Sequence, residues 1–166
     1  SRLNNTLREV KGYTYGAGSG FSMRRERGPF TARAEVVSAK TDSALIEFMN
    51  ELRNIRKPLP AAELAKVKRY LQLGYADGFE STGDIAAQVA SLVPYNLPLT
   101  TLGAFNAGIG KVTAADVQRV ATRYLDPARL TIVIAGDRAS IEEPLKKTGI
   151  APVTVVDMRG RPVIVP

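Results

Sequence analysis

The chain has 166 residues, of which 45% are hydrophobic and 23% are charged, and its formal net charge is +7. This length and apolar content suit one domain with a hydrophobic core. The sequence contains neither cysteine nor histidine. It therefore excludes disulfides, thiolate metal sites and nucleophile systems of the Ser–His or Cys–His type. No apolar run approaches the roughly 20 residues that span a bilayer.

The first residues predict an amphipathic helix, with Leu3, Leu7 and Val10 on one apolar stripe. This helix is already under way at Ser1, so we expect a domain that lacks its first strands. Gly12 then allows a tight turn into the next segment.

Two strands follow, and we expect them to pair as an antiparallel hairpin. Because side chains alternate along a strand, residues 13–23 would present two different faces. One face would carry Tyr13, Tyr15, Ala17, Ser19, Phe21 and Met23, and the other Thr14, Gly16, Gly18, Gly20 and Ser22. The second strand, residues 30–37, would have an apolar face made of Phe30, Ala32, Ala34 and Val36.

The loop between these strands holds the only dense basic cluster, Arg24-Arg25-Glu26-Arg27. We interpret it as a solvated hairpin tip, and the alternative is a phosphate-binding patch. The cluster lacks interleaved aromatic residues and matches no recognised binding motif, so we expect no nucleic-acid partner.

The rest of the chain is predicted to be mostly helical. Capping residues, prolines and apolar side chains at helical spacing predict helices that begin near Thr41, Pro60, Ser81, Leu99, Thr113 and Ser140. The β-branched run Leu130–Ala135 predicts a buried strand, and Val153–Val156 predicts an edge strand. This order indicates an α+β fold of two layers, a mainly antiparallel sheet with helices on one face, truncated at its N-terminus. We expect one domain over residues 1–157 and a tail over residues 158–166.

Two segments carry a resemblance to a known family. The run from Leu7 through Arg8, Glu9 and Gly12 to Tyr15 resembles a signature of the insulinase-like (pitrilysin) zinc metallopeptidases. The segment Leu125–Leu130, followed by Ile132–Asp137, is similar to the closing strand of the same domains. More specifically, the run from Leu7 to Tyr15 resembles the half that does not hold the zinc. The absence of histidine fits this resemblance, because the zinc half needs an H-x-x-E-H motif.

The resemblance implies roles for two side chains in trans. Tyr15 would donate to the scissile carbonyl oxygen, and Arg8 would anchor the substrate backbone. The residues alone leave other interpretations open. Tyr15 could be a strand aromatic packed on the core, and Tyr13 is a rival on the same predicted face. Arg8 could be a solvated helix residue paired with Glu9.

The glycines Gly16, Gly18 and Gly20 are expected to form a smooth face for a peptide backbone. A phosphate loop is disfavoured, because a helix should follow it directly and here a strand continues. Three acidic residues, Asp77, Glu80 and Asp84, could form an oxygen site for a hard cation, but they lack calcium-loop spacing. We expect no metal in this chain and zinc in a partner domain.

The function implied by the resemblance is that of a non-catalytic partner domain of a zinc metalloendopeptidase that cleaves unfolded peptides. Its partners would be a homologous H-x-x-E-H domain or subunit and a peptide substrate. The alternative is a structural or assembly subunit on the same fold. The family favours a periplasmic location, which nothing in the residues themselves decides.

Overall fold

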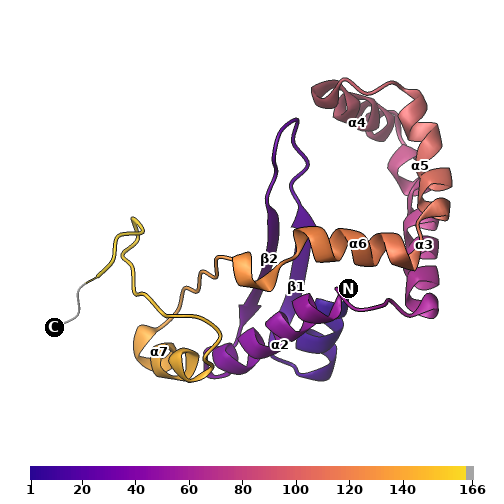
Figure 1. The fold of residues 1–166 in the computed structure, drawn as a ribbon. Helices are drawn as coiled ribbons and strands as arrows, with labels where there is room; N and C mark the ends of the chain where they lie inside the picture. The colour runs from indigo at the N-terminus through magenta and orange to yellow at the C-terminus, as the bar shows by residue number, and fades with distance from the viewer. Residues whose placement is uncertain (164–166) are drawn as a thin grey trace. The chain divides into compact units, whose positions relative to one another are not determined.

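The protein is described by a computed structural model covering residues 1–163, and it divides into two compact units. Unit 1 contains Ser1–Ser19, Ala32–Leu52 and the described part of Arg129–Pro166, and unit 2 contains Gly20–Thr31 and Arg53–Ala128. The α+β class is confirmed, because helices accompany a two-stranded sheet (Figure 1). The assignment of residues 1–157 to one domain stays a prediction.

The elements follow one another in a simple order. They are α1 (Arg2–Asn4), η1 (Asn5–Val10), β1 (Thr14–Phe21), β2 (Phe30–Val36), η2 (Ser38–Lys40), α2 (Thr41–Asn54), α3 (Ala61–Gly74), η3 (Ala76–Phe79), α4 (Thr82–Leu92), η4 (Val93–Tyr95), α5 (Thr100–Lys111), α6 (Ala114–Tyr124), η5 (Pro127–Arg129) and α7 (Arg138–Lys147). The predicted hairpin and the helices that begin near residues 41, 60, 81, 99 and 113 are therefore confirmed.

The core of unit 1 lies between the base of the hairpin, the N-terminal helix and α2. Leu3, Leu7 and Ala44 are its buried centre. Partly buried side chains that pack against this centre come from both strands and from α2, namely Tyr13, Ala17, Ala32, Ala34, Val36 and Phe48. The apolar face predicted for β2 thus faces the core, as period-2 alternation requires.

The predicted stripe of the first helix is only partly correct. Leu3 and Leu7 are 6% and 0% exposed, but Val10 is 67% exposed. The reason is that Asn5–Val10 forms a π-helix rather than an α-helix. A π-helix has hydrogen bonds from i to i+5 and a wider turn, so Val10 does not return to the buried face.

The predicted buried strand Leu130–Ala135 is wrong. In the described residues this segment has no strand pairing after η5 ends at Arg129, and Val133 is 83% exposed. A buried strand needs neighbours for its backbone groups and cover for its side chains, and residues 1–163 supply neither here. The edge strand predicted at Val153–Val156 is reduced to one antiparallel bridge between Val156 and Pro162. The end of the predicted tail, residues 164–166, lies outside the described residues.

The last helix begins earlier than its sequence signal suggested. We expected Ser140 to start it, but α7 begins at Arg138 and Asp137 is its N-cap. The Asp137 carboxylate accepts the Ala139 N–H at 3.3 Å. An aspartate at the N-cap satisfies an amide that has no partner within the helix, which places the start two residues upstream of Ser140.

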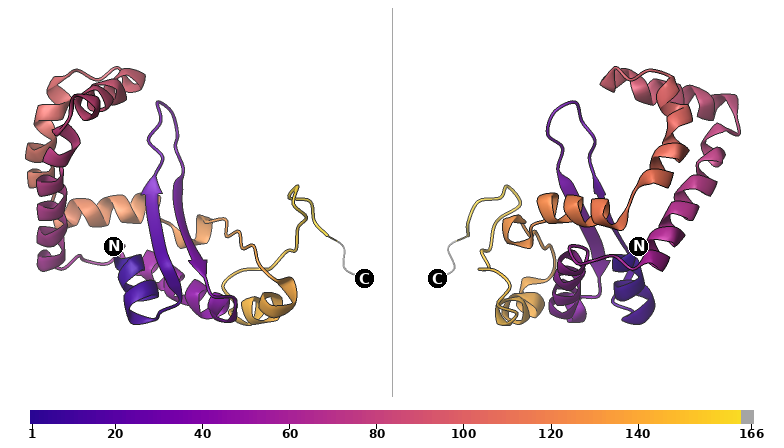
Figure 2. Two further views of the ribbon diagram at one scale, coloured as in Figure 1. Left: turned by 180° about the vertical axis from the view of Figure 1, so that it is seen from behind. Right: turned by 45° about the vertical axis from the view of Figure 1, so that its right-hand side comes forward.

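Unit 2 joins the outer part of the hairpin to helices α3 to α6. Within it, α3 and α5 run side by side in both views of Figure 2, and polar side chains of α3 and of its C-cap residue Tyr75 reach backbone carbonyls of α5. Gln72 donates to the Asn106 carbonyl at 2.9 Å, and the Tyr75 hydroxyl donates to the Leu102 carbonyl at 2.8 Å. The predicted capping boxes at Ser81 and Thr113 are both present at the starts of α4 and α6.

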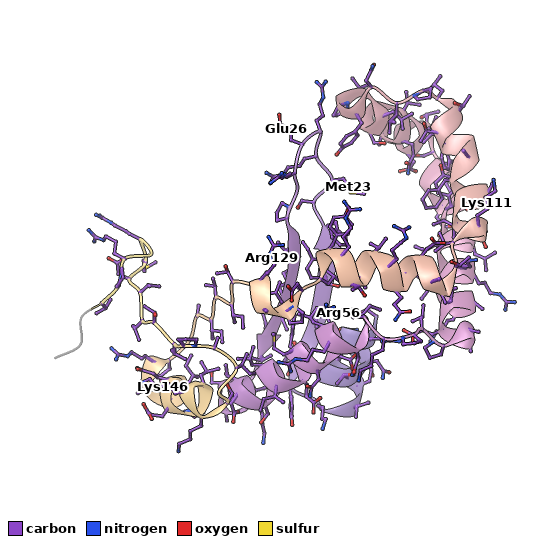
Figure 3. The ribbon with its side chains drawn as sticks, in the orientation of Figure 1. Met23, Glu26, Arg56, Lys111, Arg129 and Lys146 are labelled. Carbon is purple, nitrogen blue, oxygen red and sulfur yellow. The ribbon has the colours of Figure 1, made fainter. Side chains whose placement is uncertain are left out.

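The hairpin tip belongs to unit 2. Figure 3 places Met23 and Glu26 on this loop, and the Tyr95 hydroxyl donates to the Met23 carbonyl at 2.7 Å. Residues 24–27 are all exposed, as a solvated tip requires. Phe21 and Phe30 face each other below the loop with ring centroids 5.1 Å apart, which closes the hairpin with an aromatic pair across the strands.

Candidate functional site

The segment from Arg8 to Tyr15 turns sharply at Gly12, as the sequence predicts. Gly12 has a φ of +63°, in the left-handed region that glycine enters without steric cost. Its N–H donates to the Arg8 carbonyl at 3.1 Å, and the Tyr13 N–H donates to the Leu7 carbonyl at 2.8 Å. These bonds satisfy the open carbonyls at the end of η1 and fix the start of β1 against the helix.

Two side-chain interactions fasten the same helix to α2. The Thr6 hydroxyl donates to the Glu51 carboxylate at 2.7 Å, and the Lys11 ammonium lies 3.1 Å from the Glu47 carboxylate. The hydrogen bond and the charge of Glu47 raise the pKa of Lys11 above its ordinary value. These two contacts therefore fix the segment before Gly12 against α2.

Strand β1 contains one more residue than the strand that it pairs with. At the base, the Val37 N–H donates to the Tyr13 carbonyl at 3.0 Å, and near the tip the Ser22 N–H donates to the Pro29 carbonyl at 2.9 Å. Ser22 is nine positions beyond Tyr13, whereas Val37 is eight positions beyond Pro29. In a regular antiparallel ladder these separations are equal, so β1 contains a β-bulge.

Thr14 marks the position of this bulge. Its hydroxyl accepts the Gly16 N–H at 3.0 Å and lies 2.5 Å from the Glu35 carbonyl oxygen and 2.8 Å from the Gly16 carbonyl oxygen. One hydroxyl hydrogen serves only one of the two carbonyls at a time. The side chain thus stands between Gly16 and Glu35, where a regular ladder would have a direct bond. Thr14 itself is only 7% exposed.

Tyr15 follows Thr14 and lies almost entirely in solvent, being 96% exposed. Tyr13 and Ala17, which share its predicted face, instead pack against the core of unit 1. The interpretation of Tyr15 as a core aromatic is therefore wrong, and the bulge is the physical reason, because it re-aims side chains relative to simple alternation. The rival Tyr13 is the core aromatic. Within residues 1–163, the Tyr15 hydroxyl makes no hydrogen bond.

Arg8 lies on the surface of η1 beside Glu9. Its Nε atom is 3.5 Å from the Glu9 Oε1 atom, and the two side chains are 54% and 61% exposed. The pairing expected under the solvated-helix interpretation is thus present. An exposed pair of this kind contributes at most about 1 kcal/mol, so it leaves Arg8 available to a stronger anionic or carbonyl partner. No hydrogen bond or ion pair joins Arg8 to Tyr15 among the described residues.

The glycines beyond the bulge form an open surface. A Cβ atom added at Gly18 or Gly20 would meet no atom within 4 Å, and at Gly16 the nearest atom would be Asn4 Oδ1 at 3.9 Å. None of the three has a positive φ. Neither packing within the described residues nor backbone conformation therefore requires glycine there, although each glycine costs about 0.5–1 kcal/mol relative to alanine inside a strand.

Asn4 covers part of the strand. Its side-chain oxygen accepts the Ala17 N–H at 2.9 Å. That amide is consequently unavailable to an added strand, so the glycine-rich face of β1 is more open to a ligand than its edge at Ala17. Sequence analysis missed both Thr14 and Asn4. For Thr14 a weak signal existed, because threonine hydroxyls bond to backbone groups two residues away in turns.

No group of three or more acidic, histidine or cysteine side chains in residues 1–163 is arranged to hold a metal ion. The Asp84 carboxylate, one of three considered for a hard cation, instead accepts bonds from the Ser81 N–H and hydroxyl. A zinc site does not fit this chain, since the whole sequence lacks the histidine and cysteine that zinc prefers. No helix in the described part is long and apolar enough to cross a membrane.

Comparison with protein families decides what this segment is. Residues 1–71 match the family model described as "Peptidase M16 inactive domain". The match contains Arg8, Tyr15 and the three glycines, and it confirms the recognition of an insulinase-like domain of the non-catalytic type.

Solved structures extend the similarity beyond residue 71. A peptidase M16 inactive domain from Pseudomonas fluorescens is 29% identical, with a TM-score of 0.67, over 76% of this chain and 30% of that chain. A protease from Helicobacter pylori is 19% identical, with a TM-score of 0.56, over 76% of this chain and 31% of that chain; this likeness concerns the fold alone. The domain spans about a third of the length of either structure. No curated protein matches it.

Proposed function

We propose that this chain is the non-catalytic half of an M16-type zinc metalloendopeptidase that cleaves unfolded peptides. A homologous domain or subunit with an H-x-x-E-H motif would hold the zinc and activate the attacking water. This chain would supply side chains that contact the substrate. The observation that carries the proposal is the 96% exposure of Tyr15 beside an open glycine face.

Tyr15 has the chemistry that the proposed role needs. Peptide hydrolysis develops negative charge on the carbonyl oxygen, and a fixed donor aimed at that oxygen stabilises the transition state. A phenol hydroxyl without a partner in the described chain can donate there without first breaking another bond. One donor of this kind is typically worth roughly 2.7–4 kcal/mol in the barrier.

Arg8 would bind the peptide backbone near the reacting bond. Its guanidinium presents several donors in a planar fork, and its present contact, the exposed Glu9 carboxylate at 3.5 Å, is weak. The glycines at 16, 18 and 20 would let the extended peptide approach the sheet closely, since no side chain stands out from the backbone there.

Photo-crosslinking tests this placement of the substrate. A benzoylphenylalanine at position 15 is expected to capture an unfolded peptide when the H-x-x-E-H partner is present. The same group at Tyr70, which is 78% exposed on α3, serves as the control and should capture far less. Equal capture at both positions would contradict the proposal and favour a structural or assembly subunit on the same fold.

A further inference from the structure

We propose that Thr14 is a positioning residue, whose hydroxyl holds the β-bulge that turns Tyr15 out of the sheet. This inference rests on the proposed role of Tyr15 and adds the residue that orients it. Thr14 would not touch the substrate, because it is 7% exposed and its hydroxyl is engaged with the strand backbone.

The first step of the argument is the location of the bulge. Between Tyr13 and Ser22 the two strands change register by one residue. A regular ladder continued down from Ser22 and Pro29 would place Gly16 opposite Glu35, with a direct bond from the Gly16 N–H to the Glu35 carbonyl. The Gly16 N–H donates to the Thr14 hydroxyl, which also lies 2.5 Å from the Glu35 carbonyl oxygen. The hydroxyl therefore occupies the gap that the extra residue opens.

The second step is the cost of the gap without that hydroxyl. A bulge separates backbone groups that would otherwise pair, and the Thr14 hydroxyl offers such groups a partner within the sheet. The Thr14 hydroxyl accepts the Gly16 N–H and lies closer to the Glu35 carbonyl oxygen, at 2.5 Å, than to the Gly16 carbonyl oxygen, at 2.8 Å, so one side chain contacts both strands. Valine has the same shape and neither function. Serine keeps both functions and lacks only the methyl group.

The third step links the bulge to Tyr15. Thr14 and Tyr15 are the residues on which simple alternation fails, since Thr14 is buried and Tyr15 is exposed while both Tyr13 and Ala17 face the core. If the strands shifted into regular register, the bulge would disappear. The Tyr15 side chain would then change its direction relative to the sheet. The hydroxyl of Thr14 opposes that slip.

The test compares Thr14→Val with Thr14→Ser in the full chain. Amide hydrogen exchange at Gly16, followed by NMR, is expected to become much faster in Thr14→Val and to stay near the original rate in Thr14→Ser. With the H-x-x-E-H partner and an unfolded peptide, Thr14→Val should lower kcat about 10- to 100-fold, as small misplacements of reacting groups do. KM should change little, and Thr14→Ser should restore kcat.

Thr31→Val is the matched control, because it removes a hydroxyl at an exposed position of β2. It should leave Gly16 exchange and kcat unchanged. If Thr14→Val fails to fold, Thr14→Ala carries the same test without added bulk. Unchanged Gly16 exchange in Thr14→Val, or an equal loss of kcat in Thr14→Ser, would overturn the positioning role.

Tyr15→Phe separates this inference from the proposed function. If Tyr15→Phe lowers kcat and Thr14→Val does not, the positioning role is wrong while the function of Tyr15 stands. If Tyr15→Phe leaves kcat unchanged, the proposed function fails, and Gly16 exchange still reports whether the Thr14 hydroxyl holds the bulge.

Discussion

Thr14 and Tyr15 are neighbours on β1 with opposite environments, since Thr14 is 7% exposed and Tyr15 is 96% exposed. Adjacent strand residues normally point to opposite faces, but here the two residues around Tyr15 at even spacing, Tyr13 and Ala17, both pack on the core. One extra residue in β1 lets Thr14 and Ala17, which are three positions apart, both lie on the buried side of the strand. It leaves one tyrosine in the core and sends the next one into solvent.

Gly12 should be intolerant of substitution. Its φ of +63° costs a residue with a Cβ roughly 1–2 kcal/mol, so Gly12→Ala is expected to lower the free energy of unfolding by about that amount. The matched control is Gly108→Ala within α5, where a Cβ meets nothing within 4 Å. That change should raise stability by about 0.5–1 kcal/mol. Urea denaturation measures both, and an equal effect of the two substitutions would contradict the account.

Leu7 is expected to be the most sensitive position of the first helix. Because it is 0% exposed, Leu7→Ala should lower the free energy of unfolding by about 2–5 kcal/mol. Val10→Ala is the control, since Val10 is 67% exposed and should change stability by no more than about 0.5 kcal/mol. A comparable loss for Val10→Ala would mean that the helix is α-helical through Val10 and buries that side chain.

Local signals in the sequence predicted much of the fold. The capping boxes at Ser81 and Thr113 and the turn at Gly12 were predictable because their chemistry lies within a few residues. The strand predicted at 130–135 was wrong, because a β-branched run forms a strand only beside a neighbour, and residues 1–163 provide none. The sequence of such a segment does not determine whether another strand pairs with it.

The candidate residues Arg8 and Tyr15 were predicted only through family resemblance. The hydrogen bonds of Thr14 beside Tyr15 were not predicted. Simple alternation along the strand predicted that Thr14 shares a face with the glycines and that Tyr15 shares the other face with Tyr13. A single inserted residue reverses such assignments, and its position depends on hydrogen bonds between distant residues such as Thr14 and Glu35. The π-turn that exposes Val10 is similar, because sequence periodicity assumes a regular helix.

Gly18 should matter for ligand binding and not for folding. A Cβ there meets nothing within 4 Å, and valine favours strands by up to about 1 kcal/mol, so Gly18→Val should leave stability equal or slightly higher. Affinity for an unfolded peptide should fall about tenfold or more, equivalent to at least about 1.4 kcal/mol, because branched side chains would keep the peptide from the sheet. Ser19→Val, on the adjacent exposed position, is the control. Unchanged peptide affinity in Gly18→Val would remove the glycine face from the site.

Acid sensitivity is expected at α7. Hydrogen bonds from Arg138 and Lys146 lower the pKa of Glu142 from 4.5 to about 2. Because the pKa is lower in the folded state, this carboxylate contributes stability above about pH 4.5, and the contribution is lost as the pH falls toward 2. Glu142→Gln should therefore unfold at a lower temperature than the original chain at pH 7. The two melting temperatures should converge near pH 2, and a gap that stayed constant between these values would contradict the assignment.

The most direct test of the central claim is the turnover of an unfolded peptide by this chain with its zinc-containing H-x-x-E-H partner. Tyr15→Phe removes only the exposed hydroxyl, and the account predicts that kcat falls about 10²- to 10³-fold while the free energy of unfolding is unchanged. Tyr70→Phe, which changes another exposed tyrosine, should retain the original kcat. Full turnover by Tyr15→Phe would contradict the claim that this domain contributes to the chemistry.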